Sequence, residues 1–245
     1  MSLAVRFLGS GDAFGSGGRF QTCIHLAAAG GSVLVDCGAS SLVALRRFGV
    51  DPQEIDCVVL SHLHGDHFGG VPFLVLDAQF KRRTRPLTIA GPPGVEPRVR
   101  AAMEALFPGS SRVARRFPTR FVELPEREAL DLGPCAVTAF PVVHPSGATP
   151  FALRLACDGR VVAYSGDTEW TPALLDAARG ADLFIAEALF FDRPVKYHLD
   201  FQTLMAHREE LACGRLVLTH MGEDMLGRLD GLGVEWADDG KVFVV

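Results

Sequence analysis

Short apolar runs that end at a glycine, an aspartate or a histidine recur along the whole chain. They are rich in β-branched residues and are followed by turn-forming residues, which is typical of β-strands. The predicted strands cover residues 3–9, 22–28, 32–38, 55–61, 86–91, 135–142, 151–156, 160–167, 181–188 and 214–220. Between them lie segments with helical spacing of apolar residues, several of which open with Pro, Ser, Thr or Asp and close with Gly. The predicted helices cover residues 40–49, 71–80, 97–107, 171–180 and 200–214.

The alternation of strands and helices predicts an α/β fold. Residues 32–49 and 160–180 each run from a strand, through Asp and Gly in a turn, into a helix, which indicates a faint two-fold repeat. Such a repeat would give two sheets packed face to face with helices outside them. The most turn-rich region, residues 90–97, is typical of a surface loop and not of a linker. We therefore expect residues 1–245 to form a single domain.

Composition excludes several classes of function. With 245 residues, of which 48% are hydrophobic, the chain can bury a substantial core. Its net charge of −5 argues against a broad cationic surface for nucleic acid or anionic lipid, although a local basic patch stays open. The cysteines lie singly, without a CxxC pair, as expected for reduced packing residues. No basic leader and no run near the roughly 20 apolar residues of a membrane span occurs. We expect a cytoplasmic protein without membrane contact.

The stretch LSHLHGDHFGG, residues 60–70, carries the densest group of candidate metal ligands. His62 and His64 are two positions apart in an extended segment and therefore project to the same side. Asp66 and His67 follow a glycine that lets the chain turn toward the same space. Imidazole and carboxylate ligands suit zinc, and the mixture also admits manganese or iron. The alternative is a histidine-rich surface loop with solvated side chains.

Three further candidate ligands follow predicted strands elsewhere in the chain. His144, Asp167 and His220 each stand at the carboxyl end of an apolar run, where α/β enzymes place their chemistry. Each taken alone is more typical of a cap or a packing residue, but their joint occurrence predicts one cluster. Two divalent ions roughly 3.5 Å apart would lower the pKa of a shared water and hold the substrate oxygen under attack. The expected reaction is hydrolysis.

These motifs, HLHGDH, His144, the SGDT around Asp167 and the LTH of His220, resemble the metallo-β-lactamase superfamily over nearly the whole chain. The resemblance implies a four-layer αββα sandwich with two metal ions, for which zinc fits best. It also implies two triads of ligands: His62, His64 and His144 for one ion, and Asp66, His67 and His220 for the other. Asp167 would bridge the ions together with a hydroxide. Esters, lactones, thioesters and phosphodiesters are all cleaved on this scaffold, so the motif leaves the substrate open.

The segment AEALFFDRPVKYHLDF favours one substrate class. His198 lies 22 positions before His220, is not needed as a metal ligand and is free to act as an acid. This arrangement resembles the branch of ribonuclease Z and the phosphoribosyl cyclic phosphodiesterases. In that branch Glu187 would orient and charge His198, which would stabilise the transition state and protonate the leaving oxygen, while Asp66 takes the proton of the attacking water. The alternatives are a loop histidine without a chemical role and a carboxylate bonded elsewhere.

Two features of the sequence restrict the substrate expected within this branch. Ribonuclease Z carries an RNA-gripping arm between the positions that match His144 and Asp167, but these residues are only 23 positions apart here. This argues against a large RNA and favours a small or cyclic phosphodiester. The cyclic phosphodiesterases of phosphonate breakdown have similar spacing but carry an N-terminal cysteine cluster, whereas this region holds only Cys23. We therefore expect phosphodiester chemistry without that specific role. A homodimer is the default expectation from such relatives.

Several residues keep two interpretations. Asp36 could accept a hydrogen bond from a ligand histidine or cap the helix that begins near Ser40. The glycine-rich loop 9–20, with Arg19, and the basic run 81–85 could contact phosphate or serve as a connector and solvated charge. Two rival functions also stand beside the phosphodiesterase: an acyl hydrolase, acting on a lactone or thioester with the same metals, and a non-catalytic metal-binding accessory protein.

Overall fold

A computed structural model describes residues 2–245, which form two mixed β-sheets. The first sheet contains β1 (Ala4–Gly9), β2 (Cys23–Ala28), β3 (Gly31–Val35), β4 (Ile55–Val59), β5 (Leu87–Gly91), β6 (Thr119–Glu123) and β14 (Val242–Val244). The second contains β7 (Ala129–Asp131), β8 (Ala136–Pro141), β9 (Phe151–Cys157), β10 (Arg160–Tyr164), β11 (Leu183–Glu187), β12 (Arg215–Thr219) and β13 (Glu235–Trp236).

The two sheets repeat one pattern of pairing. Their orders are β14-β1-β2-β3-β4-β5-β6 and β7-β8-β9-β10-β11-β12-β13. In each sheet the first four strands in this order pair antiparallel and the remaining neighbours pair parallel. The repeat indicated by the sequence therefore extends over both halves, with β3 matching β10 and β4 matching β11.

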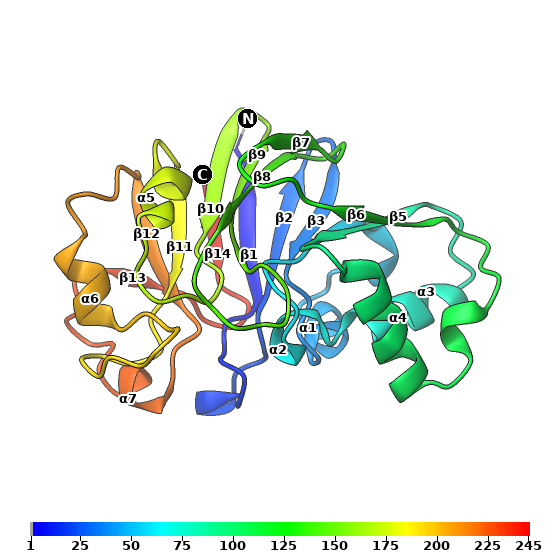
Figure 1. Ribbon diagram of the computed structural model, residues 1–245, viewed down its shortest axis with the longest axis horizontal. Coiled ribbons are helices and arrows are strands. Elements are labelled where there is room, and N and C mark those ends of the chain that lie inside the picture. Colours follow the sequence, from blue (N-terminus) through cyan, green and yellow to red (C-terminus); the bar gives the residue numbers. More distant parts are fainter. Residues whose placement is uncertain (1) are drawn as a thin grey trace.

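Helices cover the outer faces of both sheets (Figure 1). On the first sheet lie α1 (Ser41–Arg47), α2 (Gly65–Phe68), α3 (Val71–Phe80) and α4 (Val95–Leu106), with the short 3-10 helices η2 (Pro52–Glu54) and η3 (Ser110–Arg112). On the second lie α5 (Ala173–Ala178), α6 (Phe201–Ala206) and α7 (Glu223–Leu226). A further 3-10 helix, η1 (Ser16–Gly18), sits in the loop after β1.

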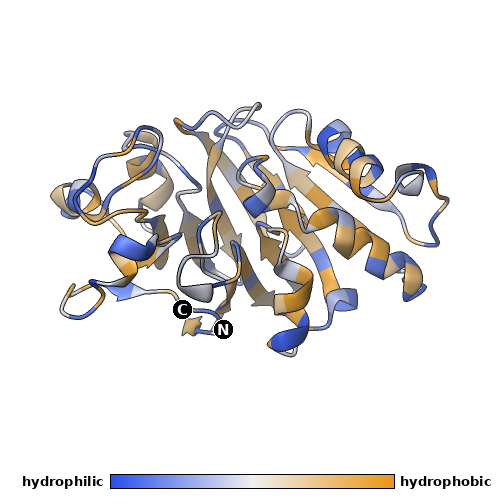
Figure 2. Cartoon of the chain, turned by 90° about the horizontal axis from the view of Figure 1, so that it is seen from below, coloured by the Kyte–Doolittle hydropathy of each residue, from blue (hydrophilic) through white to orange (hydrophobic). Residues whose placement is uncertain are grey.

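Three apolar cores separate these layers. The core between the sheets contains Phe7 of β1 and Tyr164 of β10. Leu34 of β3 belongs to the core shared with α1, α3 and α4, and Phe184 of β11 to the core shared with α5 and α6. Alternate residues of a strand pack into opposite cores, because successive side chains of a strand point to opposite faces. The fold is thus the expected four-layer αββα sandwich, with hydrophobic residues gathered on the strands and the inner sides of the helices (Figure 2).

The structure contains every predicted strand and helix, several of them shortened, and adds some short elements. β7 and β13 have three and two residues, too few to show an alternating pattern. β6 and β14 stand at sheet edges: β6 contains only two apolar residues and no buried one, and β14 has only three residues. The helix predicted over 200–214 ends at Ala206, after which the chain turns and buries Leu211. No helix within residues 2–245 is long and apolar enough to cross a membrane.

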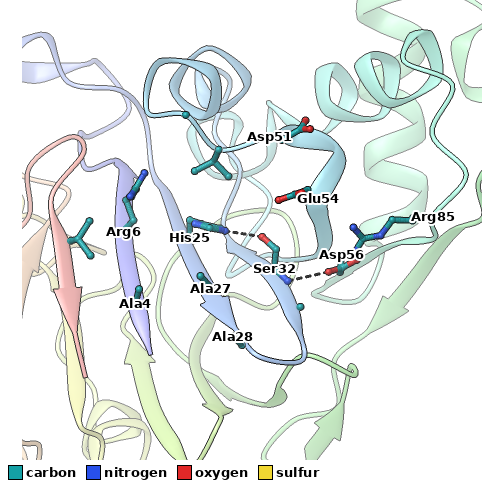
Figure 3. Close-up of a pocket in the computed structure, with 14 residues that line it drawn as sticks. Ala4, Arg6, His25, Ala27, Ala28, Ser32, Asp51, Glu54, Asp56 and Arg85 are labelled. Atoms are coloured by element: carbon teal, nitrogen blue, oxygen red, sulfur yellow. Dashed lines mark hydrogen bonds and ion pairs between the residues drawn. The ribbon is translucent and has the colours of Figure 1, made fainter. Parts of the chain in front are cut away.

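A hollow of about 440 Å³ lies on the outer face of the first sheet, toward the amino ends of β3 and β4 (Figure 3). There His25 of β2 shares a hydrogen bond with the Ser32 hydroxyl, with 2.7 Å between Nε2 and Oγ. Burial, together with the nearby Arg6 guanidinium, lowers the pKa of His25 to about 4. The imidazole is therefore held neutral in the folded protein.

This depressed pKa predicts an acid-dependent loss of stability. The folded protein disfavours protonated His25, whereas the unfolded chain takes up this proton as the pH falls through 6.5. The free energy of unfolding is therefore highest above pH 6.5 and decreases as the pH falls toward 4. Between pH 7.5 and pH 5, His25→Gln should remove about 2 kcal/mol of the pH-dependent fall in unfolding free energy. Urea unfolding of both proteins at the two pH values measures the difference. Parallel losses in the two proteins would contradict the prediction.

Candidate metal centre

All seven predicted ligands meet at the carboxyl ends of the strands, between the edges of the two sheets. They come from the loop after β4 and helix α2, and from the residues that follow β8, β10 and β12. Five of the seven are buried, with exposed fractions of 8% or less. The members of this cluster are His62, His64, Asp66, His67, His144, Asp167 and His220.

The first group in the cluster consists of histidines. The candidate ligand atoms of His62, His64 and His144 all lie within 4.8 Å of one another. The closest pair is Nδ1 of His64 and Nε2 of His144, at 3.0 Å. This is the triad that the resemblance assigns to one ion.

The second group combines carboxylates with imidazoles. Oδ2 of Asp66 lies 3.1 Å from Nε2 of His67 and 3.3 Å from Nε2 of His220. These residues reach one point from α2 and from the end of β12, which belong to different halves of the fold. They form the second predicted triad.

Asp167 lies between the two groups. Its Oδ2 atom is 3.9 Å from Nε2 of His62, 3.3 Å from Nε2 of His67 and 3.5 Å from Nε2 of His220. One carboxylate oxygen therefore faces histidines of both triads, as a bridging ligand requires.

Unpartnered buried atoms test whether these residues fit metal ions. Nε2 of His62, Nε2 of His67 and Oδ1 of Asp167 are buried without a hydrogen-bond partner among residues 2–245. Buried polar atoms are normally bonded, so such a concentration needs an explanation. Imidazole nitrogens and carboxylate oxygens are the donors that bind divalent zinc, manganese or iron. The cluster fits divalent metal ions.

Asp36 fixes the orientation of His67 from behind. It follows β3 with a backbone φ of 58°, and its Oδ2 accepts a hydrogen bond of 2.7 Å from Nδ1 of His67. It also accepts bonds from the backbone N–H and the hydroxyl of Ser61. The N-cap of α1, Ser40, has no side-chain capping bond, so Asp36 serves the cluster and not the helix. With Nδ1 occupied, Nε2 of His67 is left to face the other ligands.

Tyr197 fixes His144 in a comparable way, through its backbone. Its carbonyl oxygen accepts a hydrogen bond of 2.9 Å from Nδ1 of His144, and its own N–H donates to Oε2 of Glu169 at 3.1 Å. Tyr197 adopts a φ of 72°, which is costly for a residue with a side chain and is typical of functional sites. The sequence gives no signal for this contact, because it depends on a backbone carbonyl.

The predicted pair of Glu187 and His198 is formed. Oε2 of Glu187, the last residue of β11, lies 2.9 Å from Nδ1 of His198, and its Oε1 accepts from the backbone N–H of Thr168 at 2.5 Å. Burial raises the pKa of Glu187. Burial alone would lower the pKa of His198, but the hydrogen bond and charge of Glu187 outweigh it and raise that pKa. His198 lines a cavity of about 130 Å³ together with His64, Asp66 and Asp167.

The basic candidates have other partners. Arg19 donates to the carbonyl oxygen of Ala237 and pairs with Asp238, so it faces the C-terminal segment. Within the run 81–85, Arg83 is buried and donates to the carbonyl oxygens of residues 53, 55, 85 and 86. Both arginines therefore hold the chain together and do not face the cavity.

The comparisons with known proteins agree with this geometry. A family model described as a beta-lactamase superfamily domain matches residues 32–221. The chain belongs to the metallo-β-lactamase superfamily. With the His and Asp cluster in place, it is a metal-dependent hydrolase.

Individual relatives of this superfamily member are distant but match almost end to end. Ribonuclease Z of Bradyrhizobium diazoefficiens is 27% identical over 272 aligned positions, which cover 89% of each chain. The short form of human tRNase Z is 25% identical and has a TM-score of 0.79, with 98% of both chains covered. A diphosphatase of the PhnP family has the same fold, with a TM-score of 0.78, 20% identity and coverage of 100% of this chain and 98% of that one.

We predict that Asp36→Asn weakens metal binding without unfolding the protein. Asparagine tolerates the positive φ at this position, but it lacks the charge that holds the His67 ring, and such outer contacts typically contribute 10- to 100-fold in metal affinity. Competition with a chromophoric chelator measures the zinc affinity. Asp56→Asn, on the far hollow of Figure 3, is the matched control and should bind zinc like the wild type. Equal affinity in all three proteins would count against this role of Asp36.

Proposed function

We propose that the protein hydrolyses a small or cyclic phosphodiester with two divalent ions, of which zinc fits the ligands best. The observation that carries this proposal is the Glu187–His198 pair beside a complete set of metal ligands. A metal cluster alone would serve esters, lactones or phosphodiesters equally. An additional charged imidazole facing the cavity suits a reaction in which a phosphoryl group carries negative charge and an alkoxide leaves.

The metal ligands are assigned by their grouping. His62, His64 and His144 would hold one ion, Asp66, His67 and His220 the other, with Asp167 between them. The ions would supply Lewis-acid chemistry, polarising phosphoryl oxygens and lowering the pKa of a water molecule. Buried, hydrogen-bonded ligands such as His67 and His144 keep the required ring orientation.

The remaining steps belong to side chains of this chain. The Glu187 carboxylate accepts from Nδ1 of His198 and favours the imidazolium, so that Nε2–H can donate to the phosphoryl oxygens and then pass its proton to the leaving oxygen. Asp66, with its carboxylate in the same cavity, accepts the proton lost by the attacking water. His198 thus acts as the acid and Asp66 as the base.

A small substrate is supported by what the chain lacks relative to ribonuclease Z. The relative from Lachnoclostridium phytofermentans aligns over 270 positions, whereas the 89% of this chain that is covered amounts to about 218 residues. Roughly fifty positions of that protein therefore have no counterpart here. Between His144 and Asp167 this chain has only a loop and the hairpin of β9 and β10. This segment holds no inserted arm that could grip a folded RNA, which favours a small substrate.

The relatives' names favour a second candidate, cleavage of an RNA phosphodiester. It uses the same metals, Glu187 and His198, and differs only in the size of the substrate. A precursor transfer RNA assayed beside small diesters separates the two, since RNA cleavage at least as fast as that of any small diester would favour it.

The first test compares hydrolysis of bis(p-nitrophenyl) phosphate by the zinc-loaded wild type and by His198→Ala. Loss of a positioned acid should lower kcat/KM on the order of 100-fold, while metal content stays unchanged. His25→Gln, a histidine outside the cavity, is the control and should retain activity. An acyl hydrolase would instead cleave a lactone or thioester with little effect of His198→Ala, and that result would replace the phosphodiesterase proposal.

A further inference from the structure

Phe14 places an apolar ring at the mouth of the metal site. It belongs to the loop between β1 and β2 and is 92% exposed, yet it lines the same cavity as Asp66 and His198. It is part of none of the three apolar cores formed by residues 2–245. Exposed apolar side chains occur elsewhere on the surface, Phe80 among them, but Phe14 differs in lining the cavity of the candidate metal centre, where its ring is free to contact a ligand.

The loop that carries Phe14 is held in place by Asp12. The Asp12 carboxylate accepts hydrogen bonds from the backbone N–H of Phe14 at 3.1 Å, and from the N–H and hydroxyl of Ser16 at 2.9 and 2.7 Å. The Gln21 side chain donates to the carbonyl oxygen of Ala13 at 3.1 Å. The ring therefore stands on a preformed turn.

Both ends of the loop are tied to other parts of the chain. Asp239 accepts from the backbone N–H of Ser10 at 2.9 Å and from that of Phe20 at 2.7 Å. Gly17 has a φ of 65° and packs so closely on α7 that an added Cβ would lie 2.8 Å from Leu226. A ring on such a support can contact a ligand with little loss of conformational entropy.

Several polar groups of the loop are bonded within the protein. The amides of Phe14 and Ser16 point to Asp12, and Arg19 is bonded to the C-terminal segment with 10% of its side chain exposed. The loop consequently offers a substrate an aromatic face, while the amides of Phe14 and Ser16 and the Arg19 side chain are already bonded within the protein. Leu189 adds a second apolar residue to the same cavity.

We propose that Phe14 is a specificity residue that stacks on a planar aromatic ring of the substrate while the phosphate lies at the metal cluster. This inference rests on the proposed function, because it assigns a substrate class to the same site. The ring is either a nucleobase or an aryl ester group, which share the flat π-face that an exposed phenylalanine recognises. A purely aliphatic diester would leave Phe14 without a partner.

Binding of phosphate monoesters to the zinc-loaded protein tests the proposal without turnover. Calorimetry gives the Kd of phenyl phosphate and of thymidine 5′-monophosphate relative to that of methyl phosphate. The wild type should prefer a ring-bearing phosphate, and Phe14→Ala should reduce that preference about 5- to 100-fold, whereas Phe14→Trp should keep it. A loss confined to phenyl phosphate supports an aryl substrate, and a loss for both supports a nucleobase.

Phe80→Ala is the matched control, because Phe80 is also exposed, at 76%, but lies at the end of α3 outside the cavity. It should leave the preference unchanged. A wild type without preference for a ring, or a Phe14→Ala protein that keeps it, overturns the proposal, as does full retention in Phe14→Leu, which has no flat π-face. Since the readout is binding, absence of diester hydrolysis would defeat the proposed function while leaving this result interpretable.

Discussion

The charge balance around Asp167 is the constraint on which the site depends. A carboxylate exposed to only 2% would be strongly destabilising without positive or hydrogen-bonding partners. Burial alone would raise its pKa, but His220 and His67 hold the pKa of Asp167 well below its usual range. The side chain is thus anionic in the fold, which is the form that binds a divalent ion. Nitrogen atoms of His62, His67 and His220 lie within 3.9 Å of its Oδ2 atom.

The two-fold repeat explains how the chain achieves this placement. β3 and β10 occupy matching positions in the two sheets, and each is followed by an aspartate, Asp36 after β3 and Asp167 after β10. The two aspartates have different positions: Asp167 faces Nε2 of His67, while Asp36 accepts a hydrogen bond from Nδ1 of His67. Because the parallel strands of both sheets end at one edge, their terminal residues converge without any long excursion of the chain.

This regularity is also why much of the site could be predicted from the sequence. His144, Asp167 and His220 were recognisable because each lies within three positions after an apolar strand, and His198 because its segment resembles a known branch. Features that depend on backbone conformation could not be predicted. The carbonyl of Tyr197 behind His144 and the Asp12-centred turn under Phe14 leave no residue pattern, since each combines local geometry with contacts made only in the folded chain. The edge strand β13 could likewise not be predicted, because it has only two residues.

The loop that carries His198 contains no helix or strand, and hydrogen bonds to residues of the candidate site hold it in place. Tyr197 donates to Glu169 and accepts from His144, while the adjacent His198 bonds to the fully buried Glu187. Removing either partner of that last pair would leave the other without its hydrogen bond and opposite charge, which is costly in a buried setting. The positive φ at Tyr197 is tolerated for the same reason, because bonds on both sides determine it. One loop therefore positions both the proposed metal ligand His144 and the proposed acid His198, through the adjacent residues 197 and 198.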